Sequence, residues 1–179
     1  RAKLLGRAGA PALGVSLKVT EDGEICARSN HVLKGYWDQP EATNEAIRDG
    51  WFHTGDGGYV DEDNYVTIAD RKKDVIISGG ENVSSIEVED VLFAHEQVTE
   101  VAVIGVPDEK WGETVKALVV IEGEISEEEL IEFCRTKLAH YKCPTSIEFR
   151  DELARTATGK LQKYKLRAPY WEGHEKLVN

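Results

Sequence analysis

Three short segments of the chain place charged side chains beside glycines, where a ligand can approach the backbone closely. In the first segment, residues 50–58, Asp56 lies between two glycines. Its carboxylate can accept two hydrogen bonds from a diol such as a ribose. The alternative is a turn aspartate that bonds to its own backbone, which is the commoner arrangement for this residue type. The segment by itself favours a tight turn.

The second segment joins a charged cluster, residues 70–74, to a glycine pair at Gly79 and Gly80. Arg71 and Lys73 are residue types that engage nucleotides, and exposed glycine amides can line a narrow channel. Charge runs are more often a solvated surface. The alternative is therefore an exposed cluster that precedes a plain hairpin.

The third segment, residues 155–167, contains the sequence Thr158-Gly159-Lys160. A lysine on a glycine loop can swing onto a phosphate as a point charge. It is not a P-loop lysine, because the first glycine of that pattern is missing and Leu161 follows the lysine. The alternative is a surface lysine ahead of a basic helix.

The overall charge limits the partners. The 179 residues include 33 acidic and 22 basic side chains, a net charge of −11. This charge disfavours nucleic acids and anionic membranes as partners. Residues 155–167 nevertheless carry five basic side chains and no acidic one, whereas residues 122–132 carry six acidic side chains and no basic one. A positive patch on an acidic protein suits a small polyanion.

Cysteine, histidine and apolar residues point to a cytoplasmic protein. The three cysteines, Cys26, Cys134 and Cys143, show no spacing typical of disulfides or metal ligands, so we expect free thiols and no metal site. The five histidines are scattered, which argues against zinc. No apolar run is long enough to span a bilayer, so we expect no transmembrane segment.

The elements that must position these residues differ between the two parts of the chain. Residues 1–70 are rich in strands and turns. Alternating apolar residues predict strands at 15–19 and 24–28, a short helix follows at 41–47, and a strand–turn–strand spans 59–68. The charged cluster separates this part from residues 71–179.

Residues 71–179 have an α+β pattern. A hairpin is expected over residues 75–83, and Ser84 and Ser126 are each followed three residues later by a glutamate, the capping-box spacing that starts a helix. The remaining predicted elements are strands at 98–106, 114–121 and 146–149 and a short helix at 161–168. The prediction for this part is a small domain with a three-stranded sheet and helices.

These motifs occur together in an order that resembles the C-terminal third of the AMP-forming acyl-CoA synthetases, members of the adenylate-forming, or AMP-binding, superfamily. Within that superfamily the sequence is most similar to fatty-acyl-CoA ligases. Seven motifs carry the resemblance: residues 35–37 with 40–43, 50–56, 70–74, 78–83, 105–108 with 111–113, 141–144, and 158–160.

The resemblance implies an architecture and a reaction. Residues 1–70 would be the last, β-rich part of a large N-terminal AMP-binding domain, and residues 71–179 the hinge and the C-terminal lid domain. A carboxylic acid, expected to be a fatty acid, would attack the α-phosphate of ATP to give acyl-AMP, and the thiol of CoA would then displace AMP. The phosphate-binding loop, the acyl pocket and the Mg²⁺ site would precede Arg1, so the chain would be an inactive piece of a longer protein.

The resemblance also assigns roles in the adenylation step. Asp56 and Arg71 would hold the ribose hydroxyls of ATP or AMP. Lys160 would be the catalytic residue, bridging the carboxylate and the α-phosphate, where its positive charge meets developing negative charge. Lys73 would be the hinge and would also contact the nucleotide.

Five residues are implied in CoA binding. Gly79 and Gly80 would border the pantetheine tunnel, which a larger side chain would block. Trp111, Tyr141 and Lys142 would contact the CoA nucleotide.

Two positions depart from the family pattern. Ile77 replaces a nucleotide-contacting lysine of some relatives, and Cys143 replaces a basic residue before the proline. Two alternatives to a CoA ligase remain at this point. One is an enzyme that loads acyl-AMP onto a carrier protein, and the other is a stand-alone binding module without chemistry.

Overall fold

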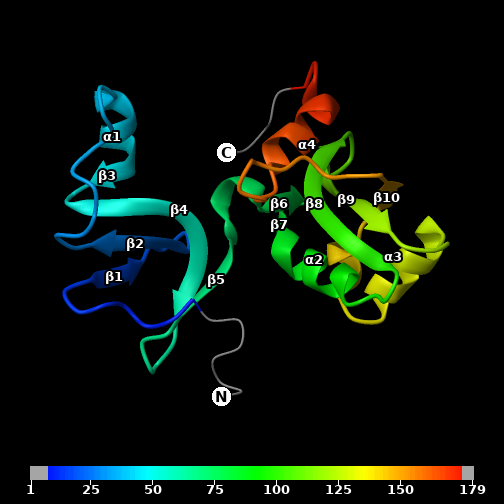
Figure 1. Cartoon of the computed structure of the whole chain (residues 1–179), viewed down its shortest axis with the longest axis horizontal. Helices are drawn as coiled ribbons and strands as arrows, with labels where there is room; N and C mark the ends of the chain where they lie inside the picture. Colours follow the sequence, from blue (N-terminus) through cyan, green and yellow to red (C-terminus); the bar gives the residue numbers. More distant parts are fainter. Residues whose placement is uncertain (1–7, 175–179) are drawn as a thin grey trace. The chain divides into compact units, whose positions relative to one another are not determined.

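The computed structural model describes residues 8–174. The chain divides into two compact units, residues 1–72 and residues 73–179 (Figure 1). The division lies just beyond the predicted boundary, because Arg71 is the last residue of a strand of the first unit. The identity of the first unit as the end of a larger domain stays a prediction.

The first unit is built on one antiparallel sheet. Its described residues form β1 (Ser16–Val19), β2 (Glu24–Arg28), β3 (Ile47–Arg48), β4 (Trp51–Val60) and β5 (Val66–Arg71). The order is β1-β2-β4-β3, and β5 also pairs with β4. The predicted short helix is α1 (Pro40–Ala46), with its proline in the first turn, where no backbone donor is lost.

The expected tight turn at residues 50–58 is wrong, because most of this segment lies in β4. The irregularity of the segment is a bulge. Glu24 pairs with Gly57 and Cys26 pairs with His53, so only Ile25 of β2 faces three residues of β4. Gly55 has a φ of 74°, which a glycine adopts without strain. Bulges of this kind redirect a side chain out of a regular ladder.

The second unit contains a sheet of five strands in its described part, where the sequence predicted three. They are β6 (Ile76–Ser78), β7 (Glu81–Val83), β8 (Val98–Asp108), β9 (Gly112–Ile121) and β10 (Ser146–Phe149). The predicted hairpin β6–β7 joins the sheet because Ser78 pairs with Gly112 of β9. Only β10 runs parallel to its neighbour, β9. The α+β class is confirmed.

Three helices cover this sheet: α2 (Ser85–Phe93), α3 (Glu127–Arg135) and α4 (Lys163–Trp171). The hydroxyl of Ser84 accepts a hydrogen bond from the Glu87 amide, and α3 begins with a complete capping box. The last helix starts later than predicted, because Leu161 pairs with Arg155 instead. Among residues 8–174, no helix is long and apolar enough to cross a membrane.

The core of the second unit lies on both faces of the sheet. Figure 1 shows the helices that cover the sheet. Along β8, Val101 and Val103 pack with residues of α2 and α3. The intervening Ala102 and Ile104 pack with residues that include Leu166 and Tyr170 of α4. Successive strand residues point to opposite faces, so a strand covered on both sides reads as a continuous apolar run. The sheet is thus a central layer between helices.

Candidate functional site

The structure brings Asp56 and Arg71 together on neighbouring strands. They are register partners of β4 and β5, and Arg71 Nε lies 3.8 Å from Asp56 Oδ1. The side chains are 35% and 57% exposed, so both remain accessible to a ligand. Asp56 is the last of the three β4 residues in the bulge. An accessible carboxylate beside a guanidinium can accept hydrogen bonds from a diol without losing its charge.

A largely buried polar cluster lies on β2 and β4 of the same sheet. Glu24, Cys26 and His53 bring one ligand atom each within 4.8 Å of one another, a grouping that could hold a metal. Local spacing in the sequence could not predict it, because the residues come from two strands. The Glu24 carboxylate already has Lys72 Nζ at 3.6 Å and Arg48 Nη2 at 3.7 Å. These cations neutralise the carboxylate, and Mg²⁺ prefers oxygen ligands, so the cluster does not suit that ion.

Lys160 lies on a turn that its backbone holds in place. The Thr156 amide donates to Lys160 O (2.8 Å), and the Lys160 amide donates to Thr156 Oγ1 (3.1 Å). Arg155 donates to Gly159 O (2.7 Å) and is itself fixed by an ion pair with Glu100 (2.7 Å). The exposed Lys160 side chain is therefore presented on a fixed base.

The positive patch predicted at residues 155–167 is partly neutralised within the second unit. Arg155, Lys163 and Arg167 form ion pairs with Glu100, Glu89 and Asp74, respectively. Lys160 Nζ has neither a hydrogen bond nor an ion pair with any of residues 8–174. Of the five basic side chains in this segment, Lys160 and Lys165 thus remain available to an incoming anion, and only Lys160 lies on the fixed turn.

Lys73 lies in a single 3-10 turn, residues Lys72–Asp74, between β5 and β6. Its carbonyl accepts a hydrogen bond from Arg167 Nη1 (2.8 Å), and Arg167 Nη1 also lies 3.7 Å from Asp74 Oδ1. The backbone of Lys73 is therefore tied to α4, whereas its side chain is exposed.

Gly79 and Gly80 form the tip of the β6–β7 hairpin with φ values of 60° and 87°. The Gly79 amide donates to Trp111 O (2.9 Å). A Cβ on Gly79 would lie 2.7 Å from Trp111 Cε3, closer than carbon atoms pack. Both the backbone conformation and the contact therefore require glycine at Gly79.

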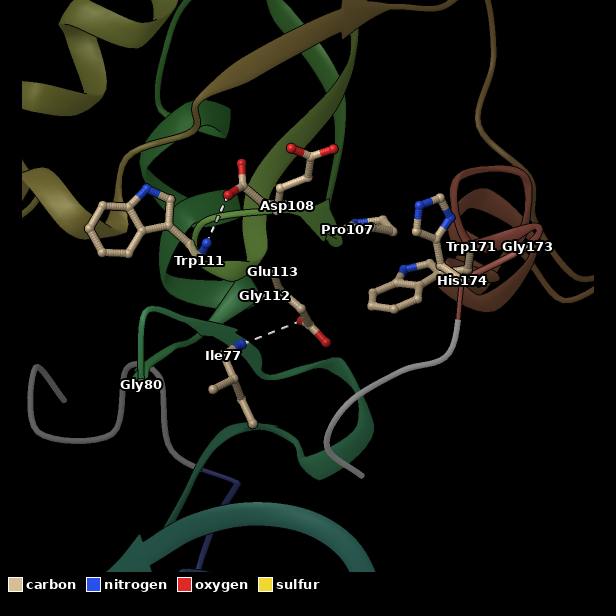
Figure 2. A pocket seen from close by; sticks show the side chains of 11 residues that line it. Ile77, Gly80, Pro107, Asp108, Trp111, Gly112, Glu113, Trp171, Gly173 and His174 are labelled. Carbon is tan, nitrogen blue, oxygen red and sulfur yellow. Dashed lines mark hydrogen bonds between the residues drawn. The ribbon is translucent and has the colours of Figure 1, made fainter.

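A cavity of about 670 Å³ borders this hairpin (Figure 2). Figure 2 shows Trp171 and His174 beside Pro107 on one side of the cavity and Trp111 on the other. The buried Glu113 also lines it and accepts a hydrogen bond from the Ile77 amide (3.4 Å). The cavity combines aromatic walls with the carboxylates of Asp108, Glu109 and Glu113.

A second cavity, of about 400 Å³, contains three of the five predicted CoA residues in its lining: Gly79, Trp111 and Tyr141. Arg135 and His140 line it as well, and neither belongs to the motifs that carry the family resemblance. Arg135 is the last residue of α3, and only folding brings it to this cavity. His140 directly precedes Tyr141 in the sequence, so its place beside a predicted CoA residue could have indicated it.

Two further residues near this cavity have other partners. The Lys142 ammonium donates to both Glu87 carboxylate oxygens (2.8 and 2.7 Å), which raises the lysine pKa and ties it to α2. Lys142 is not part of the lining of the 400 Å³ cavity. Cys143 lines the cavity, and burial raises the pKa of its thiol, so it offers no charge to a phosphate. The structure thus brings Lys142 to α2.

The family comparison places a known domain in the second unit. Residues 87–160 match the profile described as the AMP-binding enzyme C-terminal domain. The match ends on Lys160 and does not include Asp56 or Arg71.

Curated relatives cover most of the chain. It is 49% identical over 150 residues to the long-chain-fatty-acid–CoA ligase FadD13 of Mycobacterium tuberculosis, covering 83% of this chain and 30% of the relative. It is 44% identical over 172 residues to the 2-succinylbenzoate–CoA ligase of Bacillus mycoides, covering 91% of this chain and 36% of the relative. The chain thus spans about a third of the length of these proteins.

Solved structures show the same fold. ATP-bound MatB from Rhodopseudomonas palustris superposes with a TM-score of 0.88 at 39% identity, covering 95% of this chain and 37% of that one. MenE of Bacillus subtilis, solved with its acyl-adenylate intermediate, superposes with a TM-score of 0.87 at 37% identity, covering 92% and 36%.

Proposed function

The chain belongs to the adenylate-forming superfamily of AMP-binding enzymes, and on this premise we propose that it is the C-terminal part of an ATP-dependent acyl-CoA ligase. Such an enzyme joins a carboxylic acid to AMP with loss of pyrophosphate and then transfers the acyl group to the thiol of CoA. The observation that carries the proposal is the accessible Asp56–Arg71 pair in the same chain as an unpaired Lys160 on a fixed turn. These are the groups that adenylation requires.

Asp56 and Arg71 bind the nucleotide in this proposal. The Asp56 carboxylate accepts hydrogen bonds from the ribose hydroxyls, which donate. Arg71 Nε, 3.8 Å away, forms an ion pair with that carboxylate and limits its rotation. The pair therefore orients ATP, which lowers the entropic part of the activation barrier for adenylation.

Lys160 supplies electrostatic catalysis. As the acid oxygen attacks the α-phosphorus, negative charge grows on the phosphoryl oxygens. An ammonium held between the acid and the α-phosphate stabilises that charge more in the transition state than in the ground state. The fixed turn from Thr156 to Lys160 reduces the cost of holding the side chain base in position.

CoA binds to the second unit in this proposal. Gly79 and Gly80 border the pantetheine, and Trp111 and Tyr141 provide aromatic surface for the adenine. Lys142, held by Glu87, acts by positioning η3 (His140–Lys142). Positive charge for the CoA phosphates comes from Arg135, which lines the 400 Å³ cavity and also forms an exposed ion pair with Glu132 (3.2 Å). His140 lines the same cavity and offers its ring nitrogens as hydrogen-bond partners.

The acid is proposed to be a fatty acid. Relatives named for a long-chain fatty acid and for 2-succinylbenzoate are similar to the chain to nearly the same extent. The similarity of the motifs to fatty-acyl-CoA ligases supports the first of these two acids. The hinge assigned to Lys73 and the cytoplasmic location are parts of the same proposal.

The test measures pyrophosphate release by the full-length protein that contains this chain. A panel of fatty acids of increasing length, with 2-succinylbenzoate and malonate beside them, is supplied with ATP. Fatty-acid-dependent release, followed by thioester formation with CoA, is the expected result. A thioester formed only on a carrier protein would favour carrier loading, and the absence of acid-dependent release with every acid would contradict the proposal.

A further inference from the structure

The bulge in β4 gives Asp56 its place beside Arg71. Between the pairs Glu24–Gly57 and Cys26–His53, only Ile25 lies opposite Thr54, Gly55 and Asp56. A regular ladder pairs one residue with one, so the extra residues need hydrogen-bond partners outside the ladder. Groups that supply those partners therefore determine where Asp56 lies.

Thr54 supplies partners at one end of the bulge. Its hydroxyl donates to Ile25 O (2.6 Å) and accepts a hydrogen bond from the Asp56 amide (3.1 Å). The backbone of Asp56 is thus held by its neighbour on the same strand.

Glu24 supplies the partner at the centre of the bulge. Its side chain is only 6% exposed, and Oε1 accepts a hydrogen bond from the Gly55 amide (2.9 Å). Its second oxygen, Oε2, accepts a hydrogen bond from His53 Nδ1 (2.9 Å) and lies 3.6 Å from Lys72 Nζ, which also donates a hydrogen bond to Asp22 Oδ2 (2.6 Å). Gly55 directly precedes Asp56, and Lys72 directly follows Arg71. One buried carboxylate therefore contacts the neighbour of each residue of the pair.

The partners of Glu24 favour the ionised form of its carboxyl group. Burial acts to raise the carboxyl pKa, but the hydrogen bonds from His53 and Gly55 and the charge of Lys72 outweigh it and lower the pKa. A buried carboxylate held by several charge-assisted contacts is a rigid anchor.

We infer that Glu24 is a positioning residue for nucleotide binding, which holds the β4 bulge and the end of β5 so that Asp56 and Arg71 face the same ribose. This inference rests on the proposed function. Glu24 is not a catalytic residue, because its side chain is buried and acts through Gly55 and Lys72.

The test compares Glu24→Gln and Glu24→Asp with Glu21→Gln in the full-length protein. Glu21→Gln removes the same charge from an exposed position three residues earlier and is the matched control. Glu24→Gln is expected to raise the KM for ATP about tenfold in pyrophosphate release with a smaller change in kcat, because orientation of the ribose is lost while Lys160 is untouched. Glu24→Asp restores part of the effect, since it keeps the charge.

Two readouts separate positioning from a general loss of stability. The first is discrimination between ATP and 2′,3′-dideoxy-ATP, which falls in Glu24→Gln only if the diol contact is disturbed. The second is a double-mutant cycle with Asp56→Ala: the tenfold effect of Glu24→Gln on KM is expected to disappear when Asp56 is already absent.

Three results would overturn the inference. One is a wild-type KM and full ribose discrimination in Glu24→Gln. Another is an effect that is fully additive with Asp56→Ala. The third applies if Glu24→Gln does not fold: ribose discrimination in Glu24→Asp that equals the wild-type value would then overturn the inference. An inactive wild type that also fails to bind AMP in calorimetry would overturn the proposed function and this inference together, whereas the other results leave the function standing.

Discussion

At the scale of single residues, Lys160 combines an ammonium that has no hydrogen bond or ion pair among residues 8–174 with a turn that fixes its backbone, while Arg155, Lys163 and Arg167 nearby are engaged. An unpaired cation is free to meet charge that appears during a reaction. Those engaged side chains instead serve to hold the turn and α4.

Lys160→Ala is therefore expected to lower the rate of acyl-AMP formation by about 100- to 1,000-fold, the usual cost of removing one electrostatic stabiliser of a transition state. Thioester formation from supplied acyl-AMP should change little. The measurement is pyrophosphate release beside single-turnover thioester formation in the full-length protein. Lys165→Ala, an exposed lysine of the same segment, is the control. Pyrophosphate release at the wild-type rate would rule out this role.

Arg135 is the second single residue with a testable role. Arg135→Gln is expected to raise the KM for CoA about two- to fivefold, the range for an exposed charge contact, and to leave pyrophosphate release unchanged. Its cavity also contains Trp111 and Tyr141 in the lining. Lys137→Gln, close by in sequence but not part of that lining, is the control. An equal effect of both variants on the KM for CoA would show that only the general charge of this surface matters.

At the scale of elements, the 3-10 turn Lys72–Asp74 connects the two units, and its backbone is the proposed hinge. Lys73→Pro is expected to slow thioester formation at least about tenfold more than adenylation, because proline restricts φ and would limit the change between the two steps. Rapid-mixing measurement of each half-reaction tests this. Lys73→Ala, which keeps the backbone free, is the control. Equal slowing of both steps would contradict the hinge role.

The attachment of α4 to the sheet predicts a pH dependence. Tyr170 Oη donates to Glu148 Oε2 of β10 (2.5 Å), and this hydrogen bond is the main reason for the lowered pKa of Glu148. Because the pKa of Glu148 is lower in the folded state, its ionised carboxylate stabilises the fold at pH values above the ordinary pKa of 4.5. This stabilisation is lost as the pH falls through the folded-state pKa.

Tyr170→Phe is thus expected to speed amide hydrogen exchange of α4 relative to wild type at pH 7, and the ratio of the two rates should shrink toward pH 3. Comparing rate ratios removes the intrinsic pH dependence of exchange. Tyr164→Phe, on the same helix, is the control. A ratio that is the same at both pH values would argue against a contribution from the Glu148 carboxylate.

At the scale of the whole molecule, the two units differ in their apolar cores. In the described part of the first unit the buried apolar residues are Ile25, Cys26 and Val66, and the side chains of Leu13 and Trp37 are 97% and 94% exposed. The second unit buries apolar residues on both faces of its sheet. Because burial of apolar surface is the main favourable term in folding, the first unit should be the less stable one.

Limited proteolysis of the 179-residue chain tests this difference. Dilute thermolysin is expected to cleave within residues 1–72 first and to leave a resistant fragment that begins near Lys73. Mass spectrometry of the fragments over time provides the measurement. Early cleavage within β8 or β9 would contradict the expected order.

Features that depend on neighbouring residues can be predicted from the amino-acid sequence alone. Helix starts at Ser84 and Ser126 follow from a side chain and an amide three positions apart, and the glycines at the β6–β7 tip follow from backbone conformation. The family motifs also selected Asp56, Arg71 and Lys160 for the proposed site. Local backbone geometry and short motifs both depend on residues that are adjacent in the sequence.

Features that depend on pairing between distant residues could not be predicted from the sequence and became visible in the folded chain. The β4 bulge replaces the expected turn because two strands meet with unequal numbers of residues between their pairs. Glu24 contacts Gly55, 31 positions away, and Arg135 joins the cavity of Tyr141 through the end of a helix. The five-stranded sheet likewise needs the Ser78–Gly112 pair. Such contacts arise from how strands and helices pack, which no local pattern encodes.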